Sequence, residues 1–269
     1  MRLILLLLLF LPSIGFSKVY DCFPFYNELE LLQIRLDELD PVVDYFVLVE
    51  SIETQRGHPK ELCFEQNKEL FARYLPKIIH VVVEETHPEF TLWERENYQR
   101  NCIMKGLENC APNDFVLISD VDEIPRAPLI PFAEKKMNGS EFFAIGFEMT
   151  MYRFQLNRIN PQDARWAGTV GTTYRNLLKK KPQFFRDRRS KYWAFKNAGW
   201  HFTWMGGRER IRQKMRSVVE GKDNTDHLTD EVVDQLIDRI PVVPLDARFP
   251  SYVLEHADEL IQLGFISAE

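Results

Sequence analysis

The feature that most constrains the fold is an alternation of two hydrophobic patterns through the first half of the chain. Short apolar runs that are typical of buried strands lie at residues 19–23, 45–49, 78–83 and 115–119. Between the first two runs, Leu29, Leu32, Leu36 and Leu39 recur at helical spacing, with Arg35 among the polar fillers, and residues 93–107 also look helical. This alternation predicts successive βαβ units, and so an α/β fold with a mostly parallel central sheet flanked by helices.

The second half is less regular. Residues 142–154, 169–174 and 198–204 look extended, while 179–191 reads as a basic loop interrupted by proline. Gly206-Gly207 interrupts the chain, and helices are expected over 209–219 and 230–240. Since no internal repeat or low-complexity linker is present, residues 18–269 are predicted to form a single domain.

The N-terminus has the pattern of a secretory signal. Arg2 precedes the apolar run 3–11, which is well short of the roughly 20 residues that span a bilayer, and small residues Gly15 and Ser17 stand where a signal peptidase cleaves. We expect residues 1–17 to be a cleaved signal peptide, and an uncleaved signal anchor is the alternative. The mature chain would lie in the secretory-pathway lumen, in the periplasm or outside the cell, without a stable membrane span, or would be membrane-anchored if the signal stays.

The charge and the cysteine content of the chain limit the kinds of partner and metal ion that it is expected to bind. The net charge of -6, without a broad basic stripe, argues against nucleic acid as the main partner. The even number of cysteines suits an oxidising compartment, and the absence of Cys-x-x-Cys spacing argues against zinc. Cys102 and Cys110 could pair across a helix end, although three complete pairings are open to the four cysteines, Cys22, Cys63, Cys102 and Cys110.

Carboxylates gather where the fourth strand-like run ends. Asp120 and Asp122 follow it directly, and Glu50 follows the second run. Ligands of open parallel sheets bind beyond the carboxyl ends of the strands, so these residues should lie on the same side of the molecule. Two carboxylates there could converge on Mn²⁺ or Mg²⁺, which suit oxygen ligands better than Zn²⁺ does. Most Asp-x-Asp triplets are solvated turns or strand caps, so the flanking residues must decide.

Five ordered blocks of sequence favour the metal interpretation. They begin at residues 21, 43, 93, 118 and 199 and read DCFPFYNEL, VDYFVLVES, WERENYQR, ISDVDEIP and GWH. Together they resemble glycosyltransferase family 17, and the resemblance runs from about residue 19 to about residue 219. It implies a GT-A-like nucleotide-sugar fold, a nucleotide-sugar donor such as UDP-N-acetylglucosamine, inversion at the anomeric carbon and a divalent metal. By the same resemblance, Asp120 and Asp122 become the pair that holds the metal and the diphosphate.

Several other residues are candidates for donor binding. Asn97 and Arg100 lie on one helical stripe, and the planar fork of an arginine suits a diphosphate, so Arg95, Asn97 and Arg100 are expected near the donor. Glu50 could accept hydrogen bonds from uracil or ribose, and a neutral His201 could complete the metal shell. The structural alternatives are a helix-surface ion pair, a strand-end cap and a hydrogen-bonded core histidine.

Inverting transfer also needs a carboxylate that takes the proton of the attacking hydroxyl. Glu209 is the first candidate because it follows the glycine break at a helix start, where it could equally serve only the helix dipole. Glu148 and Asp163 are the alternatives. The basic segment 179–191 could attract an anionic acceptor, although a solvated loop is favoured.

The sequence thus predicts a lumenal or secreted inverting glycosyltransferase that moves a sugar, N-acetylglucosamine in the first instance, from a UDP-sugar to a glycan hydroxyl with Mn²⁺ or Mg²⁺. Two other classes stay open. A phosphohydrolase that uses an aspartate nucleophile also has Asp-x-Asp after a strand, but generally has Thr or Val where Ile124 stands. A non-catalytic carbohydrate-binding protein would bind glycan without nucleotide.

Overall fold

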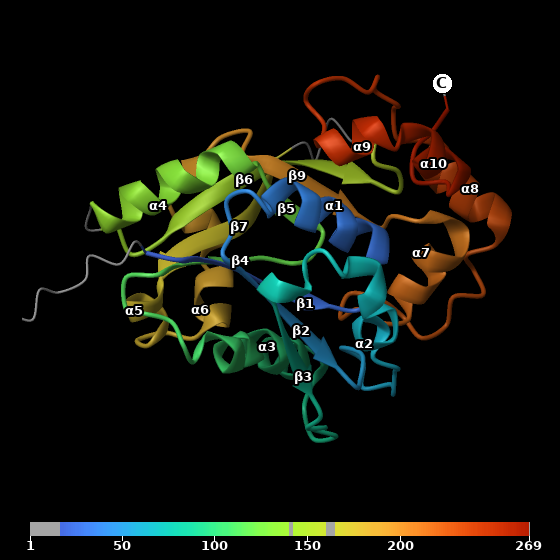
Figure 1. Ribbon diagram of the computed structural model, residues 1–269. Coiled ribbons are helices and arrows are strands. Elements are labelled where there is room, and N and C mark those ends of the chain that lie inside the picture. The colour runs from blue at the N-terminus through green and yellow to red at the C-terminus, as the bar shows by residue number, and fades with distance from the viewer. Residues whose placement is uncertain (1–16, 140–141, 160–164, 269) are drawn as a thin grey trace, which may run out of the picture.

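A computed structural model describes residues 17–139, 142–159 and 165–268 (Figure 1). The predicted signal segment up to residue 16 and the alternative base Asp163 lie outside these ranges. In the described part, nine strands share one sheet with the order β3-β2-β1-β4-β7-β6-β9-β5, and β8 pairs with β6. The strands are β1 (Val19–Phe25), β2 (Tyr45–Ser51), β3 (Ile78–Val83), β4 (Phe115–Ile118), β5 (Glu123–Pro125), β6 (Ile145–Arg153), β7 (Trp166–Thr173), β8 (Ala194–Phe195) and β9 (Gly199–Thr203).

Parallel pairing dominates the half of the sheet formed by the first four strands. β1 pairs in parallel with β2 and with β4, and β2 pairs in parallel with β3, so the carboxyl ends of all four strands lie at one edge. β7 joins β4 and β6 in antiparallel orientation, whereas β9 runs parallel to β6. The predicted α/β class with a mostly parallel, helix-flanked sheet is confirmed.

Side chains of alternate residues build a core on each face of this sheet. Phe23 and Leu48 face a cluster that includes Leu32 and Leu36, while Val47 faces a second cluster on the opposite side. The helices are α1 (Leu29–Leu39), α2 (Cys63–Asn67), α3 (Leu92–Asn101), α4 (Ile130–Asn138), α5 (Tyr174–Leu177), α6 (Pro182–Arg186), α7 (Gly207–Met215), α8 (Asp230–Asp238), α9 (Ser251–Glu255) and α10 (Ala257–Gln262). Short 3₁₀ helices lie at Lys68–Phe71, Leu75–Lys77, Cys102–Leu107, Ala127–Leu129 and Arg189–Lys191.

Helix α3 shows how local sequence sets these boundaries. Thr91 accepts a hydrogen bond from the N–H of Glu94, whose carboxylate accepts one from the N–H of Thr91, which forms a capping box at the helix start. The 3₁₀ helix Cys102–Leu107 continues α3, so the prediction of helical structure over 93–107 is confirmed.

Three expectations need correction. The basic segment 179–191 is not simply a loop, because Pro182 opens helix α6 at a position where its missing N–H is not needed. Arg35, which the pattern places among the polar fillers of the first helix, is fully buried. All four cysteines are free thiols, so the pairing of Cys102 with Cys110 does not occur in this structure. Within the described ranges, no helix is long and apolar enough to cross a membrane.

Candidate active site

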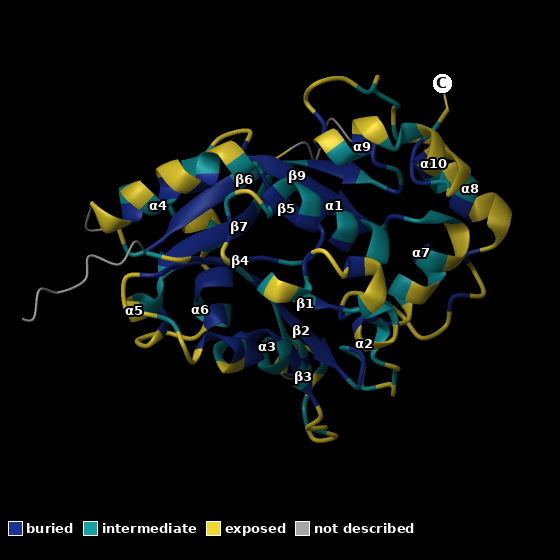
Figure 2. Cartoon of the chain, viewed as in Figure 1, coloured by how far each residue is buried: buried dark blue, intermediate teal, exposed yellow. Residues whose placement is uncertain are grey.

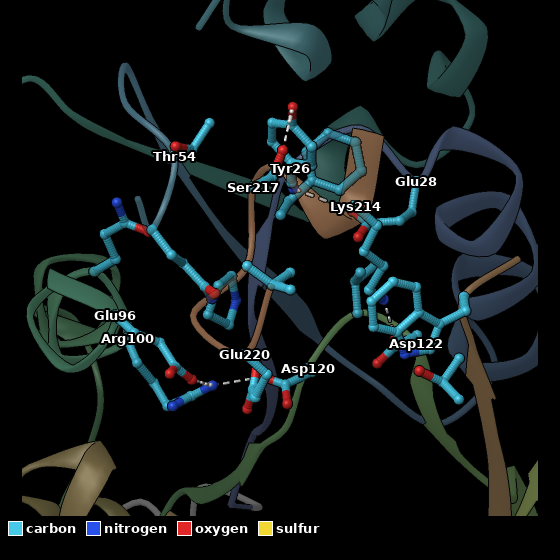
Figure 3. Close-up of a pocket in the computed structure, with 18 of the residues that line it drawn as sticks. Tyr26, Glu28, Thr54, Glu96, Arg100, Asp120, Asp122, Lys214, Ser217 and Glu220 are labelled. Atoms are coloured by element: carbon cyan, nitrogen blue, oxygen red, sulfur yellow. Dashed lines mark hydrogen bonds and ion pairs between the residues drawn. The ribbon is translucent and has the colours of Figure 1, made fainter. Parts of the chain in front are cut away.

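An open cavity of about 330 Å³ lies at the carboxyl ends of β1, β2 and β4. Residues from these strand ends form one wall, α3 contributes Glu96 and Arg100, and α7 with the segment after it closes the opposite side (Figure 3). Figure 2 shows that the sheet beneath is buried. Asp120, Asp122, Arg100 and His201 all line this cavity, so four of the residues expected at the site share one space.

Asp120 is held between two arginines. One of its carboxylate oxygens accepts a hydrogen bond from Arg100 Nη2 and the other accepts one from Arg186 Nη2, each at 2.7 Å. Loss of water raises the pKa of Asp120, but the guanidinium groups of Arg186 and Arg100 outweigh this and hold the pKa well below its usual range. Asp120 is therefore a carboxylate near pH 7.

Asp122 faces a lysine and a histidine. Its Oδ2 accepts a hydrogen bond from Lys214 Nζ at 2.9 Å, and its Oδ1 lies 3.6 Å from His201 Nε2, beyond a good hydrogen bond. The His201 ring packs on Trp166, with 4.7 Å between centroids, and its Nδ1 is buried without a partner among the described residues. Burial lowers the pKa of His201, so the imidazole is neutral near pH 7.

Lys214 reaches the cavity because of the glycines before α7. Gly206 and Gly207 have φ angles of 96° and 81°, a left-handed conformation that other residues rarely adopt. The chain turns there after β9, and the helix that follows carries Lys214 over the cavity (Figure 3). The predicted glycine break is confirmed, but the residue that it brings to the site is Lys214.

A buried ion pair under the floor fixes the acidic loop. Arg35 Nε and Nη2 donate to the carboxylate of Asp21 at 2.7 and 2.6 Å, and both side chains are fully buried. Arg35 Nη1 also donates to the backbone carbonyl oxygens of Asp120, Val121 and Glu123, at 3.1, 3.3 and 2.7 Å. Arg35 thereby sets the course of the backbone that presents both aspartates.

A second buried arginine supports the site from α6. Arg186 donates to both carboxylate oxygens of Glu123, at 2.7 and 2.9 Å, and the side chain of Glu123 is fully buried. The indole N–H of Trp166 donates to the same carboxylate at 2.6 Å. Glu123 thus orients Trp166, on which His201 packs, as well as Arg186, which holds Asp120.

A segment after α7 spans the mouth of the cavity. Arg56 forms a two-pronged ion pair with Asp223, at 2.8 and 2.9 Å, and donates to the carbonyl of Gly221. The side-chain oxygen of Gln55 accepts a hydrogen bond from the N–H of Val219 at 3.1 Å. We call residues 217–223 the strap, since these contacts tie it to the loop that follows β2.

Three of the expected donor-binding residues do not line the cavity. Glu50 is buried below it, where it accepts a hydrogen bond from the N–H of Phe64 at 3.0 Å. Arg95 donates to Glu53 at 3.0 Å and to backbone carbonyls, and so shapes the loop after β2. Asn97 is half-buried on α3 outside the cavity lining.

Neither expected base reaches the cavity. Glu209 lies in the first turn of α7 as predicted, but its side chain is 75% exposed and pairs with Arg216 at 3.0 Å. Glu148 pairs with Lys196 at 2.6 Å on β6, outside the lining. Two carboxylates that do line it, Glu28 and Glu220, form no ion pair among the described residues (Figure 3).

The arrangement suits a ligand that carries several negative charges and hydroxyl groups. Lys214 and Arg100 provide cationic groups along the wall, while Asp120 and Asp122 offer carboxylate oxygens to a metal ion or to hydroxyl groups. Aromatic side chains at the same cavity, Tyr26, Trp166 and Trp204, offer flat apolar surfaces for a base or a sugar ring.

A family model and two curated relatives match most of the chain. The model of glycosyltransferase family 17 matches residues 13–219. Beta-1,4-mannosyl-glycoprotein 4-beta-N-acetylglucosaminyltransferase from Homo sapiens and from Rattus norvegicus are each 29% identical over 237 residues, which is 76% of this chain. The match covers 44% of the human relative and 43% of the rat one, so the chain spans less than half the length of these relatives.

Solved structures with similar folds are more distant. The mannosyltransferase PcManGT from Pyrobaculum calidifontis, in complex with GDP-Man and Mn²⁺, is 15% identical, with a TM-score of 0.44 over 70% of this chain and 57% of that one.

Proposed function

Because the chain belongs to glycosyltransferase family 17, we propose that it transfers a sugar from a nucleoside-diphosphate sugar to a hydroxyl group of a glycan. The observation that carries this proposal is the cavity at the carboxyl ends of the parallel strands, which joins Asp120 and Asp122 with the cationic side chains of Arg100 and Lys214. Such a set of charges matches a sugar nucleotide, whose diphosphate is anionic and whose ribose and sugar carry hydroxyls.

We propose UDP-N-acetylglucosamine as the donor, and inversion to a β-linked product. The names of the human and rat relatives, which are N-acetylglucosaminyltransferases, support this choice of sugar. A lumenal, periplasmic or secreted location is proposed with it, from the signal-like N-terminus. Residues 18–269 remain proposed as one domain.

A divalent ion, Mn²⁺ or Mg²⁺, fits the site as a ligand shared with the substrate. Among the described residues, no group of three His, Cys, Asp or Glu side chains could enclose a metal ion alone. Ions of this kind are commonly held by one or two carboxylates together with substrate phosphates, so fewer protein ligands suffice. Asp122 Oδ1 and His201 Nε2 face each other at 3.6 Å without a good hydrogen bond, which leaves both available as ligands. When bound, the ion would neutralise charge on the departing diphosphate.

The chain's own residues share the remaining work. Each carboxylate oxygen of Asp120 uses one lone pair to accept a hydrogen bond from an arginine. The other lone pair of each oxygen is proposed to accept hydrogen bonds from hydroxyl groups of the donor. Lys214 Nζ, next to Asp122, is proposed to stabilise the diphosphate as negative charge builds up during departure. Arg100 keeps its proposed role near the donor.

A carboxylate at the cavity is proposed as the base, and Glu28 and Glu220 are better candidates than Glu209 and Glu148. Glu28 uses Oε2 to accept the N–H groups of Tyr26 and Asn27, at 3.2 and 3.1 Å. Oε1 of Glu28 has no hydrogen-bond partner within the described ranges, which leaves it for a substrate hydroxyl. Among these residues the side chain of Glu220 also makes no hydrogen bond or ion pair.

A comparison of four conservative variants tests the base. Glu28→Gln and Glu220→Gln should differ in kcat. The variant that removes the base should lose on the order of a hundredfold or more in kcat, while its affinity for UDP stays unchanged. Glu209→Gln and Glu148→Gln are matched controls and should keep wild-type rates. A loss of kcat in only one of these two controls would show that the residue changed in it, Glu209 or Glu148, is the base.

Release of nucleoside diphosphate tests the function itself. The full chain is incubated with Mn²⁺ and a panel of UDP- and GDP-sugars, with and without glycan acceptors. UDP release from UDP-N-acetylglucosamine is expected, and Asp122→Asn should abolish it, whereas Asp238→Asn, whose side chain is 75% exposed, should not. Absence of release from every donor would sink the proposal.

The same samples separate the two rival classes. A phosphohydrolase that forms an aspartyl phosphate would release phosphate from simple phosphate esters. A carbohydrate-binding protein without turnover would show no metal-dependent heat of binding with UDP in calorimetry.

A further inference from the structure

The described part of the chain begins at the end of the sheet opposite to the candidate site. The N–H of Lys18 donates to the carboxylate of Asp114 at 2.9 Å, and the carbonyl of Asp114 accepts the N–H of Tyr174, the first residue of α5. On the other side, Asn138 at the end of α4 donates to Ser17 Oγ at 3.1 Å. The start of the described chain therefore lies between the end of α4 and the start of α5, and we call this end of the molecule the amino pole (Figure 1).

Large apolar side chains are exposed at the amino pole. The rings of Trp193 and Phe142 lie 6.1 Å apart, and their side chains are 46% and 38% exposed. The ammonium group of Lys136 on α4 lies 4.5 Å from the Trp193 ring centroid. Leu178, which follows α5 directly, is 61% exposed. An aromatic pair with a lysine beside it is the composition found where proteins meet the interface of a bilayer.

Basic residues continue this surface. The segment 174–191 contains eight Lys or Arg residues and one acidic residue, in a chain whose net charge is -6. Arg186 and Arg189 turn toward the candidate site, but the lysines at 179–181 are exposed. Phe184 connects the two features, because it contacts Phe143 at 6.2 Å and lies under the guanidinium of Arg188 at 3.8 Å.

We propose that the amino pole is a surface that binds peripherally to membranes with anionic lipids. Trp193 and Leu178 would enter the interfacial region, and the lysines at 179–181 would lie against lipid phosphates and carboxylates. The partner follows from the presence of both apolar and cationic groups on this surface. A soluble polyanion would bind the lysines but would leave the exposed side chains of Trp193 and Leu178 in water.

This assignment fixes the orientation of the cavity. Parallel strands begin at the amino pole and end at the cavity, so an amino pole on the membrane directs the cavity away from the lipid. The proposal does not depend on the reaction that the cavity catalyses.

Vesicle binding by the full chain tests the proposal. Partition is measured by flotation with phosphatidylcholine vesicles, with and without about a third of phosphatidylglycerol. Anionic lipid should strengthen binding, and Lys179→Glu with Lys181→Glu should weaken binding to the anionic vesicles about 30-fold or more, because the loss of each lysine alone costs about fivefold. The matched control is Lys222→Glu with Arg239→Glu, which makes the same change of charge elsewhere and should keep wild-type binding.

A fluorescence measurement identifies the side chain that contacts lipid. Brominated phosphatidylglycerol should quench tryptophan emission, and Trp193→Phe should remove most of this quenching. Trp93, which is 54% exposed on α3, is the matched control, and Trp93→Phe should leave the quenching intact. Near-ultraviolet circular dichroism checks that each variant is folded.

Three results would overturn the assignment. One is equal loss of binding in both charge-reversal pairs, and another is quenching that survives Trp193→Phe. The third is binding to heparin as tight as to anionic vesicles, without any quenching by brominated lipid, which would identify a site for soluble polyanions.

Discussion

Replacing Arg35 by methionine should lower both the stability of the fold and the affinity for the donor. Arg35 and Asp21 are fully buried and form a two-pronged ion pair, so the variant leaves the Asp21 carboxylate without a compensating charge. Breaking a buried pair in this way costs about 3–5 kcal/mol. Since domains are stable by about 5–15 kcal/mol, the variant should fold but unfold at much lower urea concentration.

A double variant separates the two roles of Arg35. Asp21→Val with Arg35→Met removes both charges, and apolar replacement of a buried pair is often close to neutral. The carbonyl oxygens of Asp120, Val121 and Glu123 still lose their donor, at about 1 kcal/mol each. Both variants lose these bonds, so the double variant should be about 3–5 kcal/mol more stable than Arg35→Met, which is the cost of leaving Asp21 unpaired. It should nevertheless bind UDP as weakly, because the loop that presents both aspartates has lost its anchor in both variants.

Urea unfolding followed by tryptophan fluorescence gives the free energies, and calorimetry with UDP and Mn²⁺ gives the affinities. The reasoning fails at its first step if the double variant is no more stable than the single one. It fails at its second step if the double variant binds UDP as tightly as the wild type, since Arg35 would then support the sheet without positioning the acidic loop.

Three further predictions concern other parts of the molecule. Arg56→Ala, which frees the strap, should speed UDP dissociation in stopped-flow measurements while the urea midpoint changes little, because its ion pair with Asp223 is exposed; unchanged dissociation would show that the strap does not cover the donor. Thr91→Ala should destabilise the protein by about 1 kcal/mol in urea unfolding, since it removes the cap of α3, and a change near zero would contradict that cap. Burial raises the pKa of the Cys110 thiol to about 12 and raises the pKa of the Cys22 thiol as well, so both should resist a thiol reagent in the native state. After unfolding all four thiols should react, and fewer than four would reveal a disulfide.

The parallel half of the fold was predictable because buried parallel strands are nearly continuous apolar runs. The four runs predicted at 19–23, 45–49, 78–83 and 115–119 correspond to β1 to β4, with ends that differ by at most two residues. The direction of these strands then brought Asp120, Asp122 and Arg100 to one cavity, as expected. The hydrophobic pattern and the strand direction are sufficient to predict those parts of the fold and the site whose signal is local in the sequence.

The cationic half of the site was not predictable, because its signals are not local. Lys214 lies 92 residues from Asp122, and Arg186 lies 66 residues from Asp120, so no spacing in the sequence relates them. The buried position of Arg35 does have a local signal in the sequence, since Arg35 shares a helical face with Leu32 and Leu39. A charged side chain on an apolar helix face needs a buried partner. Glu209 was found at a helix start, but position along a helix does not fix the side toward which a residue points.

At the candidate site, both aspartates of the acidic loop have cationic partners. Arg100 and Arg186 hold Asp120, and Lys214 holds Asp122, so the charge of each aspartate is already compensated within the protein. A sugar nucleotide that brings both a diphosphate and a divalent ion is close to balanced as well, and it can exchange with these partners without leaving a buried charge unpaired. This explains why the aspartates need no preformed metal cage, and it implies that UDP and Mn²⁺ bind with strong positive coupling, since either one alone would disturb the balance that both together preserve.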